Sequence, residues 1–387
     1  MKIAVHYAEI GLKGRNRPRF EARLCENLER ALRPLVPPRI RKLFGRLLVE
    51  LPPDTPFEAA ATRIGRVFGV AYFSRASVCK PTLEAIESMV DGFIKEQSFE
   101  SFGVRVRRSE KSHPFTSSEL AVRLGTRIQK RSGARVDLSQ PELWVELHVL
   151  SREALLLHEK IPGPGGMPVG TAGRIIGLIS GGIDSPVAAF RMLKRGCTLS
   201  YVHFHSSPFT SAASQDKVRE LVARLAVYQG PVKLHLVPFG ELQERLVRGA
   251  PASPRIVLYR RLMLRIAEAI ARREGALALT TGESLGQVSS QTLANLDTIN
   301  RAATLPVFRP LIGLDKSEII ELAQRIGTYE ISIELDEDCC SYLMPSHPAT
   351  WTRPEPVEAI ESELDIAGMV HAALERSSCE RIDPSDE

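Results

Sequence analysis

The chain has 387 residues, of which 43% are hydrophobic and 25% charged, so it is long enough for two or three globular domains. It has no apolar run near the roughly 18 residues of a membrane span, and its first residues lack a signal peptide. We therefore expect a cytoplasmic protein without a membrane partner. The six cysteines form no Cys-x-x-Cys pair, which argues against a zinc site or an iron–sulfur cluster.

The net charge of +5 is divided unevenly along the chain. Residues 1–135 hold 26 Lys and Arg against 14 Asp and Glu, whereas residues 355–387 hold 10 acidic and 2 basic side chains. A basic front half indicates a polyanionic partner such as a nucleic acid. A solvated basic surface is the alternative explanation.

The first 162 residues mix strands and helices in two successive α+β domains, which we place at residues 1–54 and 55–162. The expected strands are 2–6, 40–51 as a pair around Gly45, 69–77, 102–108, 144–149 and 154–159. The expected helices are 18–35, 57–68, 83–95 and a helix capped by Ser117 or Ser118 that runs to about 131.

Basic side chains gather in the second of these domains. Residues 105–135 carry nine basic and two acidic side chains, and several of the basic ones recur at spacings of three and four on one helix face. Aromatic residues are few there, so contacts to the phosphates and shape of RNA fit better than base stacking. The candidate RNA-binding residues are Arg105, Arg107, Lys111, Arg123, Arg127, Lys130 and Arg131.

Residues 163–172 are rich in Pro and Gly and are expected to form a linker. Beyond it, strands and helices alternate over 173–350, which predicts a doubly wound parallel sheet of the α/β class. The expected strands are 174–180, 198–204, 232–238, 276–281 and 305–309. The expected helices lie near 185–195, 212–228, 240–248, 255–273, 287–295 and 316–326. Residues 351–387 are expected to be an acidic C-terminal tail with one helix near 366–376.

Residues 180–185 read Ser-Gly-Gly-Ile-Asp-Ser and join a buried apolar strand to a helix whose expected N-cap is Ser185. Free N–H groups and the helix dipole make such a loop a phosphate site. The Gly-Lys-Ser/Thr ending of a Walker loop and the dinucleotide pattern Gly-x-Gly-x-x-Gly are both missing. An ordinary buried strand-to-helix turn is the alternative.

Polar segments follow several later strands of this domain. His203 and His205 alternate on one strand, but a third metal ligand is not evident. Gly282 permits a close approach of the backbone, and Lys316 opens a helix from which its ammonium can reach a phosphoryl group. The adjacent Cys339 and Cys340 suggest a sulfur-handling thiol, and a buried or incidental pair is the alternative.

Together these segments resemble one family. Ser-Gly-Gly-Ile-Asp-Ser resembles the PP-loop of ATP pyrophosphatases, and residues 55–162 resemble a THUMP domain. With Val-His-Phe-His-Ser, Thr-Thr-Gly-Glu-Ser-Leu-Gly-Gln-Val, Arg-Pro-Leu-Ile and Glu-Asp-Cys-Cys following in order, the chain resembles the tRNA 4-thiouridine synthetases, or tRNA sulfurtransferases, over about residues 1–350. The resemblance implies a ferredoxin-like fold for residues 1–54. It also implies the ATP-dependent exchange of oxygen for sulfur at C4 of uridine 8 in tRNA.

The resemblance also implies roles for particular residues and partners. The resemblance implies ATP and Mg²⁺ at the loop and a cysteine desulfurase as the persulfide donor. A sulfur-carrier protein of thiamine synthesis is a further implied partner. The implied ATP-binding residues are Leu178, Ile179, Ser180, Gly181, Gly182, Ser185, His203, Phe204, Arg260, Gly282 and Gln291. The implied catalytic residues are Asp184, Lys316 and Cys339, with Cys340 or Cys379 assisting the release of sulfur through a disulfide.

The chain resembles the shorter family members, which lack a C-terminal rhodanese domain, and a homodimer is the common default for its assembly. Two other classes of function remain open from the residues alone. An amide-forming PP-loop ligase acting on a small carboxylate would use the same loop but would not need the basic front half. A non-catalytic tRNA-binding protein would keep the basic half and carry a relic of the ATP site.

Overall fold

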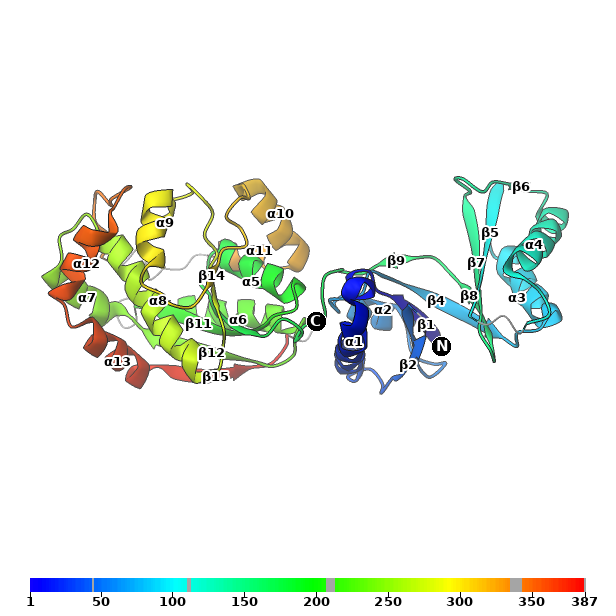
Figure 1. The fold of residues 1–387 in the computed structure, drawn as a ribbon, viewed down its shortest axis with the longest axis horizontal. Helices are drawn as coiled ribbons and strands as arrows, with labels where there is room; N and C mark the ends of the chain where they lie inside the picture. The colour runs from blue at the N-terminus through cyan, green and yellow to red at the C-terminus, as the bar shows by residue number, and fades with distance from the viewer. Residues whose placement is uncertain (44, 110–112, 207–212, 335–342, 386–387) are drawn as a thin grey trace. The chain divides into compact units, whose positions relative to one another are not determined.

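A computed structural model describes residues 1–43, 45–109, 113–206, 213–334 and 343–385. The chain divides into two compact units, Met1–Gly166 and Met167–Glu387. Each unit has its own sheet (Figure 1). Within the described residues, no helix is long and apolar enough to cross a membrane.

The first unit contains one nine-stranded sheet in the order β2-β3-β1-β4-β8-β7-β5-β6, with β9 paired to β4 (Figure 1). Its strands are β1 (Lys2–His6), β2 (Arg39–Leu43), β3 (Arg46–Glu50), β4 (Tyr72–Cys79), β5 (Ser101–Arg108), β6 (Arg135–Val136), β7 (Leu143–Val149), β8 (Ala154–Leu157) and β9 (Ile161–Pro162). Its helices are the 3-10 helix η1 (Glu9–Asn16), α1 (Arg17–Leu32), α2 (Phe57–Ile64), α3 (Leu83–Lys95) and α4 (Ser117–Ser132).

Strand β4 connects the two expected α+β domains, because it pairs with β1 along its first half and with β8 along its second half. The core around α1 and α2 takes in Ala60, Ile64 and Phe73, so it extends beyond residue 54, where the sequence placed a boundary. Burial of these apolar side chains against β1 and β3 ties α2 to the first domain.

All four α-helices of this unit pack on one face of the sheet. Phe73 of β4 lies in the core with α1 and α2, and Cys79 packs on the core with α3 and α4. Side chains alternate along a strand, so these two residues share a face. The other face curls so that its two halves meet: Ala4 and Leu48 form a buried cluster with Leu155 and Leu157. We call this surface the concave face.

The N-cap of helix α4 lies one residue before the first of its two expected positions. Thr116, rather than Ser117 or Ser118, is the N-cap: its hydroxyl accepts from the N–H of Glu119 at 3.1 Å, and the Glu119 carboxylate accepts from the N–H of Thr116 at 2.7 Å. This reciprocal capping box satisfies two N–H groups at once, which a single serine cap does not.

The second unit contains a six-stranded sheet in the order β14-β13-β10-β11-β12-β15. Its strands are β10 (Arg174–Leu178), β11 (Thr198–His205), β12 (Val232–Pro238), β13 (Leu279–Thr280), β14 (Val307–Phe308) and β15 (Ser378–Ile382). Its helices are α5 (Asp184–Lys194), α6 (Ala213–Ala226), α7 (Gly240–Gly249), α8 (Arg255–Arg273), the 3-10 helix η2 (Ser289–Gln291), α9 (Leu293–Asn300), α10 (Lys316–Ile326), α11 (Tyr329–Ile333), α12 (Pro354–Ser362) and α13 (Ile366–Arg376).

Strands β10 to β14 are parallel, as the alternation predicted, and β15 runs antiparallel at one edge. From β10 the chain proceeds through β11 and β12 in one direction and later through β13 and β14 in the other. The order therefore reverses between β10 and β13. Loops leaving the carboxyl ends of strands at such a switch point diverge and leave a crevice for a ligand.

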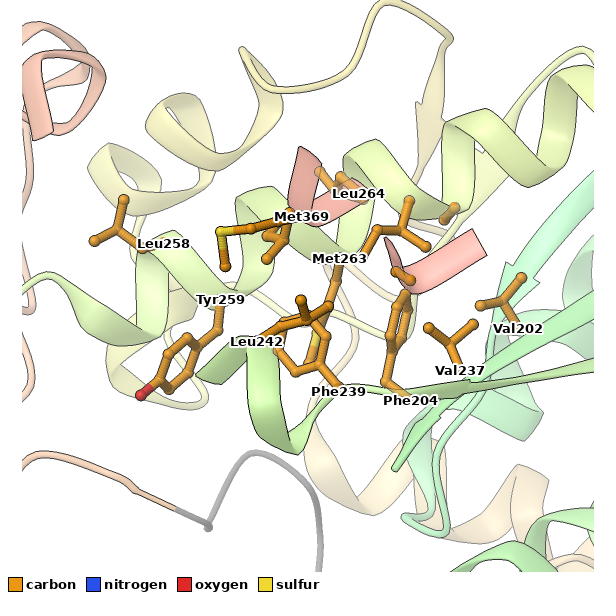
Figure 2. Close-up of a cluster of buried hydrophobic side chains, with 14 of the residues drawn as sticks. Val202, Phe204, Val237, Phe239, Leu242, Leu258, Tyr259, Met263, Leu264 and Met369 are labelled. Carbon is orange, nitrogen blue, oxygen red and sulfur yellow. The ribbon is translucent and has the colours of Figure 1, made fainter. Parts of the chain in front are cut away.

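One face of this sheet is covered by α8 and α13. Phe204 and Val237 of the sheet pack with Met263 of α8 and Met369 of α13 in a single apolar core (Figure 2). The expected helix at 287–295 is replaced by η2 and α9, because the Thr292 hydroxyl accepts from the N–H of Asn295 and starts a new helix there. The long helix α8, predicted at 255–273, has those bounds.

The segment after residue 350 differs most from expectation. The sequence predicted an acidic tail with one helix, but the chain forms α12, α13 and β15, and β15 pairs with β12 from Val232↔Ile382 to Leu236↔Ser378. Glu361 of α12 is buried and accepts from Arg261 Nε and Nη2 of α8 at 2.9 and 2.6 Å. Apolar residues recur between the acidic ones and pack into the core of this unit. The high net charge of the segment therefore did not indicate that it is folded.

Candidate functional site

The candidate site is a cavity of about 250 Å³ at the switch point between β10 and β13. It is enclosed by the loop after β10, the loop after β13 and one side of α8. The sequence-predicted residues that line it are Leu178, Ile179, Ser180, Gly182, Asp184, Ser185, Phe204, Arg260, Gly282 and Gln291. Gly181 and His203 are outside this lining.

The Ser-Gly-Gly-Ile-Asp-Ser loop is closed by its last residue. Ser185 does not cap α5, which begins at Asp184; instead its hydroxyl accepts from the N–H of Ser180 at 2.9 Å and donates to the carbonyl of Ser180 at 3.2 Å. Ser185 is therefore not the predicted N-cap, because its hydroxyl is used to join the two ends of the loop. The first N–H groups of α5 are then not capped by a serine at the helix start, as a phosphate site requires.

Gly282 brings the second loop against the first. A Cβ atom at this position would lie 2.7 Å from the backbone nitrogen of Ser185 and 2.8 Å from its Cα, so the two backbones are too close for any side chain. The close approach predicted from the sequence is therefore present, and it fixes the width of the cavity between β10 and β13.

Asp184 is held on both carboxylate oxygens. Lys316 Nζ donates to Oδ1 at 2.6 Å, and Gln287 Nε2 donates to Oδ2 at 2.9 Å. Lys316 is the first residue of α10, whose start is fixed by a capping box between Asp315 and Glu318. Lys316 and Gln287 thus reach Asp184 from two other segments of the chain. A carboxylate, an ammonium and an amide therefore lie together at the loop 180–185.

The inner wall of the cavity carries an acceptor that lacks a donor. Gln291 is 7% exposed, and within the described part of the chain its Oε1 has no hydrogen-bond partner. A buried acceptor of this kind costs free energy unless a ligand or water satisfies it. Phe204 adds an apolar wall, with its ring 5.4 Å from that of Phe239 (Figure 2). The lining therefore offers both an apolar surface and a hydrogen-bond acceptor to a ligand.

His203 supports the loop from behind. It is buried, and its Nδ1 lies 3.0 Å from the carbonyl oxygen of Ile179, at the end of β10. Its neighbour on the same strand face, His205, has its pKa lowered to about 4, first by burial and then by the charges of His203 and Arg219. Among the described residues, no group of three or more His, Cys, Asp or Glu is arranged to hold a metal ion.

Several lining residues were missed by the sequence reading. Glu283 is buried, accepts from Thr281 Oγ1 at 2.9 Å and accepts from Arg309 Nε at 2.6 Å. Glu283 and Arg309 both lie inside quoted motifs, Thr-Thr-Gly-Glu and Arg-Pro-Leu-Ile, so the signal was present without an assigned role. Met263 is also part of the lining and faces the core in Figure 2; nothing in its sequence context distinguishes it from other core residues.

The predicted RNA-binding residues separate into two groups. Arg105 and Arg107 of β5 lie on the concave face, as their alternation predicted, with Arg105 stacked on Trp144 at 3.4 Å. On the opposite side of the sheet, the arginines of α4 face α3, where Arg123 and Arg127 bind Glu87, and Arg127 and Arg131 bind Asp91. Lys130 is exposed on the same helix, and Lys111 lies outside the described residues.

The cysteines assigned to sulfur chemistry are only partly visible. Cys339 and Cys340 lie outside the described residues. Cys379 is on edge strand β15, three strands from β10, with its Sγ 3.9 Å from His235 Nε2. At about 4.8 Å per strand, it is roughly 14 Å across the sheet from the loop strand, so the structure does not bring Cys379 to the cavity. Burial also raises the pKa of its thiol.

Comparison with known proteins agrees with this geometry. The sequence matches the ThiI ferredoxin-like domain over residues 2–74, the THUMP domain over 80–159 and the family described as thiamine biosynthesis protein (ThiI) over 170–366. It is 48% identical over 368 residues to a probable tRNA sulfurtransferase of Thermus thermophilus, covering 95% of this chain and 90% of the relative. It is 45% identical over 383 residues to one of Moorella thermoacetica, covering 99% and 98%.

A solved structure resembles the whole chain. The crystal structure of a 4-thiouridine synthetase–RNA complex with bound ATP matches with a TM-score of 0.90 and 35% identity, over 99% of each chain. The family suggested by the sequence motifs is confirmed by these matches. The chain belongs to the tRNA sulfurtransferase (ThiI) family, with a ferredoxin-like, a THUMP and a PP-loop domain in that order.

Proposed function

We propose that this protein is an ATP-dependent tRNA sulfurtransferase that converts uridine 8 of tRNA to 4-thiouridine. The observation that carries the proposal is the cavity at the switch point, where Asp184, Lys316 and the loop 180–185 converge. Family membership supports the reaction class, and a related 4-thiouridine synthetase has been crystallised with RNA and ATP.

The residues divide the binding of ATP between them. The N–H groups at the start of α5 would receive the β- and γ-phosphates, the Gln291 acceptor and the Phe204 wall would receive the adenosine, and Arg260 would face the phosphates from α8. Lys316, already at the mouth of the loop, would stabilise negative charge that grows on the α-phosphate during attack.

Asp184 fits the Mg²⁺ that such a reaction uses. Mg²⁺ in nucleotide sites is commonly held by one or two carboxylates together with the phosphates of the substrate, and Asp184 is the carboxylate at the phosphate loop. When bound there, Mg²⁺ would neutralise charge on the departing pyrophosphate. The hydrogen bonds from Lys316 to Oδ1 and from Gln287 to Oδ2 would orient the Asp184 carboxylate for this role.

The chemistry takes two steps. In the first, O4 of the uridine attacks the α-phosphorus of ATP and pyrophosphate leaves, so that O4 becomes part of a good leaving group. In the second, the terminal sulfur of a persulfide, or sulfide released from it, attacks C4, and AMP departs with the former O4. A persulfide attack leaves an S–S bond, which a second thiol cleaves to release the thiocarbonyl and form a disulfide.

We assign the sulfur-carrying role to Cys339 and take a cysteine desulfurase as the donor. Cys379 lies on an edge strand three strands from β10, so we assign the resolving role to Cys340. The family description also favours a second role, the supply of sulfur for the thiazole of thiamine through a sulfur-carrier protein. Restored growth without thiazole in a strain deprived of its own family member would support that role.

The test of the proposed function is a reconstituted reaction. The protein is incubated with Mg²⁺, ATP, a cysteine desulfurase with cysteine, and unmodified tRNA, and the tRNA is digested and analysed for 4-thiouridine. We expect one 4-thiouridine per tRNA, at position 8, formed only when ATP is present. An amide product from a small carboxylate, or tRNA that binds and stays unmodified, would replace the proposal by one of the two alternative classes.

A further inference from the structure

Two histidines from distant strands meet on the concave face of the first unit. His6 is on β1 and His148 on β7, with β4 and β8 between them in the sheet, yet their ring centroids are 6.2 Å apart. The curl of the sheet brings them together, and both are buried, with 6% and 3% of their surfaces exposed. Tyr72 stacks on His6 at 4.3 Å and closes one side of the pair.

Positive charge surrounds this pair without an acidic partner of its own. Arg46 and Arg107 lie close enough that each charge is felt at His6, and Arg107 lowers the pKa of Arg46 after burial does. In the described part of the first unit, neither guanidinium has a carboxylate within ion-pair distance. The charge of Glu146 acts on Arg46, but the Glu146 carboxylate is itself paired with Lys160 at 2.6 Å and with Arg105 at 3.8 Å.

The imidazole of His148 adds a donor. Arg46 Nη1 lies 3.1 Å from His148 Nε2, and a guanidinium can only donate, so Nε2 is the acceptor. In a neutral imidazole the proton is then on Nδ1. Among the described residues, this N–H has no acceptor, and Nε2 of His6 has no hydrogen-bond partner. Buried polar atoms without a hydrogen-bond partner destabilise the fold unless a ligand or water supplies the missing bond.

Burial keeps His6 neutral in the absence of an anion. The pKa of His6 is lowered to about 3, first by burial and then by Arg46, Arg107 and Lys160. The fold therefore holds two guanidiniums of like charge near each other, at an electrostatic cost that the neutral ring of His6 does not offset. A site that concentrates positive charge without internal compensation is typical of one that binds an anion.

We propose that His6, Arg46, Arg107 and His148, here called the histidine–arginine cluster, bind a backbone phosphate of the substrate RNA at the junction of the ferredoxin-like and THUMP domains. Arg46 and Arg107 supply the charge, and the imidazole N–H groups supply further donors once the side chains close on the phosphate. Arg105, stacked on Trp144 further along β5 and β7, extends the same surface. The proposal rests on the proposed function for the identity of the RNA.

The test compares two double variants that remove the same formal charge. Arg46→Gln with Arg107→Gln alters the cluster, and Arg123→Gln with Lys130→Gln alters the helix α4 on the other face of the sheet. Affinity for unmodified tRNA is measured by filter binding over a range of salt concentrations. We expect the cluster variant to bind about tenfold or more weakly and its log–log salt slope to fall by about 2, while the control variant changes each quantity far less.

Two further measurements keep the result interpretable. Thermal melting reports whether the cluster variant is folded, and the single variant Arg107→Gln, at an exposed position, is expected to show about half the change in slope without any loss of fold. Equal weakening in the two double variants, or an unchanged cluster variant, would overturn the proposal. Failure of the proposed function would appear separately, as wild-type protein that binds tRNA with the cluster dependence described but forms no 4-thiouridine.

Discussion

The cavity at the switch point and the histidine–arginine cluster are both proposed to bind anions, but their charges are balanced differently. In the cavity, Lys316 is paired with Asp184 at 2.6 Å, so each charge is balanced by the other. In the cluster, Arg46 and Arg107 have no carboxylate partner within the described residues. The first arrangement suits a site that must release its products, whereas the second suits one that holds a polyanion through many contacts.

The basic face of α4 supplies the contrast to both. Its arginines look like an RNA-binding surface in the sequence, but three of them form ion pairs with Glu87 and Asp91 of α3. The arginines of α4 are therefore held by carboxylates of the same domain, whereas Arg46 and Arg107 are not, as far as the described residues go. Counting charges along the sequence is no guide to which of them are available to a ligand.

The largest expected effect separates chemistry from binding. Asp184→Ala removes the carboxylate that Lys316 and Gln287 hold at the phosphate loop, so tRNA-dependent release of pyrophosphate should fall by roughly 10²-fold or more. Affinity for tRNA should be unchanged, because the cluster lies in the other unit. A matched control is Asp297→Ala, at an exposed position of α9 paired only with Arg301. Retained adenylation in Asp184→Ala would remove this residue from the mechanism.

A smaller effect should distinguish the paired arginines from the unpaired ones. Arg127→Ala leaves the buried carboxylate of Asp91 without its two-bond partner, so the melting temperature of the first unit should fall by a few degrees, as expected for an unsatisfied buried group. Lys130→Ala, on the same helix, should melt as wild type does. If Arg127→Ala melted normally and bound tRNA poorly, α4 would be an RNA surface after all.

The smallest effect concerns pH. The pKa of His6 is about 3 in the folded chain, and its ordinary value is 6.5. Between these two pH values, His6 is protonated in the unfolded chain and neutral in the folded chain. Stability contributed by neutral His6 is thus present above about pH 6.5 and is lost as pH falls, by on the order of 1 kcal/mol per pH unit. Denaturant titrations at several pH values should show a shallower acid loss for His6→Phe, which keeps a ring against Tyr72. An identical pH profile would mean that His6 is not held neutral by its surroundings.

The sequence predicted the second unit well because its signals are local. The parallel strands, the helices at 255–273 and 316–326 and the loop 180–185 each follow from a few contiguous residues. The same holds for most cavity residues, since the loops that bear them leave neighbouring strands. Ser185 was misplaced as a helix cap because its hydroxyl bonds backward to Ser180 rather than forward along the helix, a choice that tertiary packing decides.

The first unit was predicted less completely because its important contacts are distant in the sequence. His6, Arg46, Arg107 and His148 come from four strands and span more than 140 positions, so nothing contiguous marks them. Their meeting depends on the curl of one shared sheet, which the sequence divided into two domains. The C-terminal segment was misjudged for a related reason: Val357, Met369 and Ala373 find their core partners on α8, about 100 residues earlier.

The account turns on the attack of uridine O4 on ATP, and one isotope measurement tests it directly. A tRNA carrying ¹⁸O at O4 of uridine 8 is thiolated by the protein with ATP and a persulfide donor, and the AMP released is examined by mass spectrometry. The account predicts one ¹⁸O atom in AMP for each 4-thiouridine formed. Unlabelled AMP accompanying 4-thiouridine would show that O4 was never bonded to the α-phosphate and would contradict the mechanism built on Asp184 and Lys316.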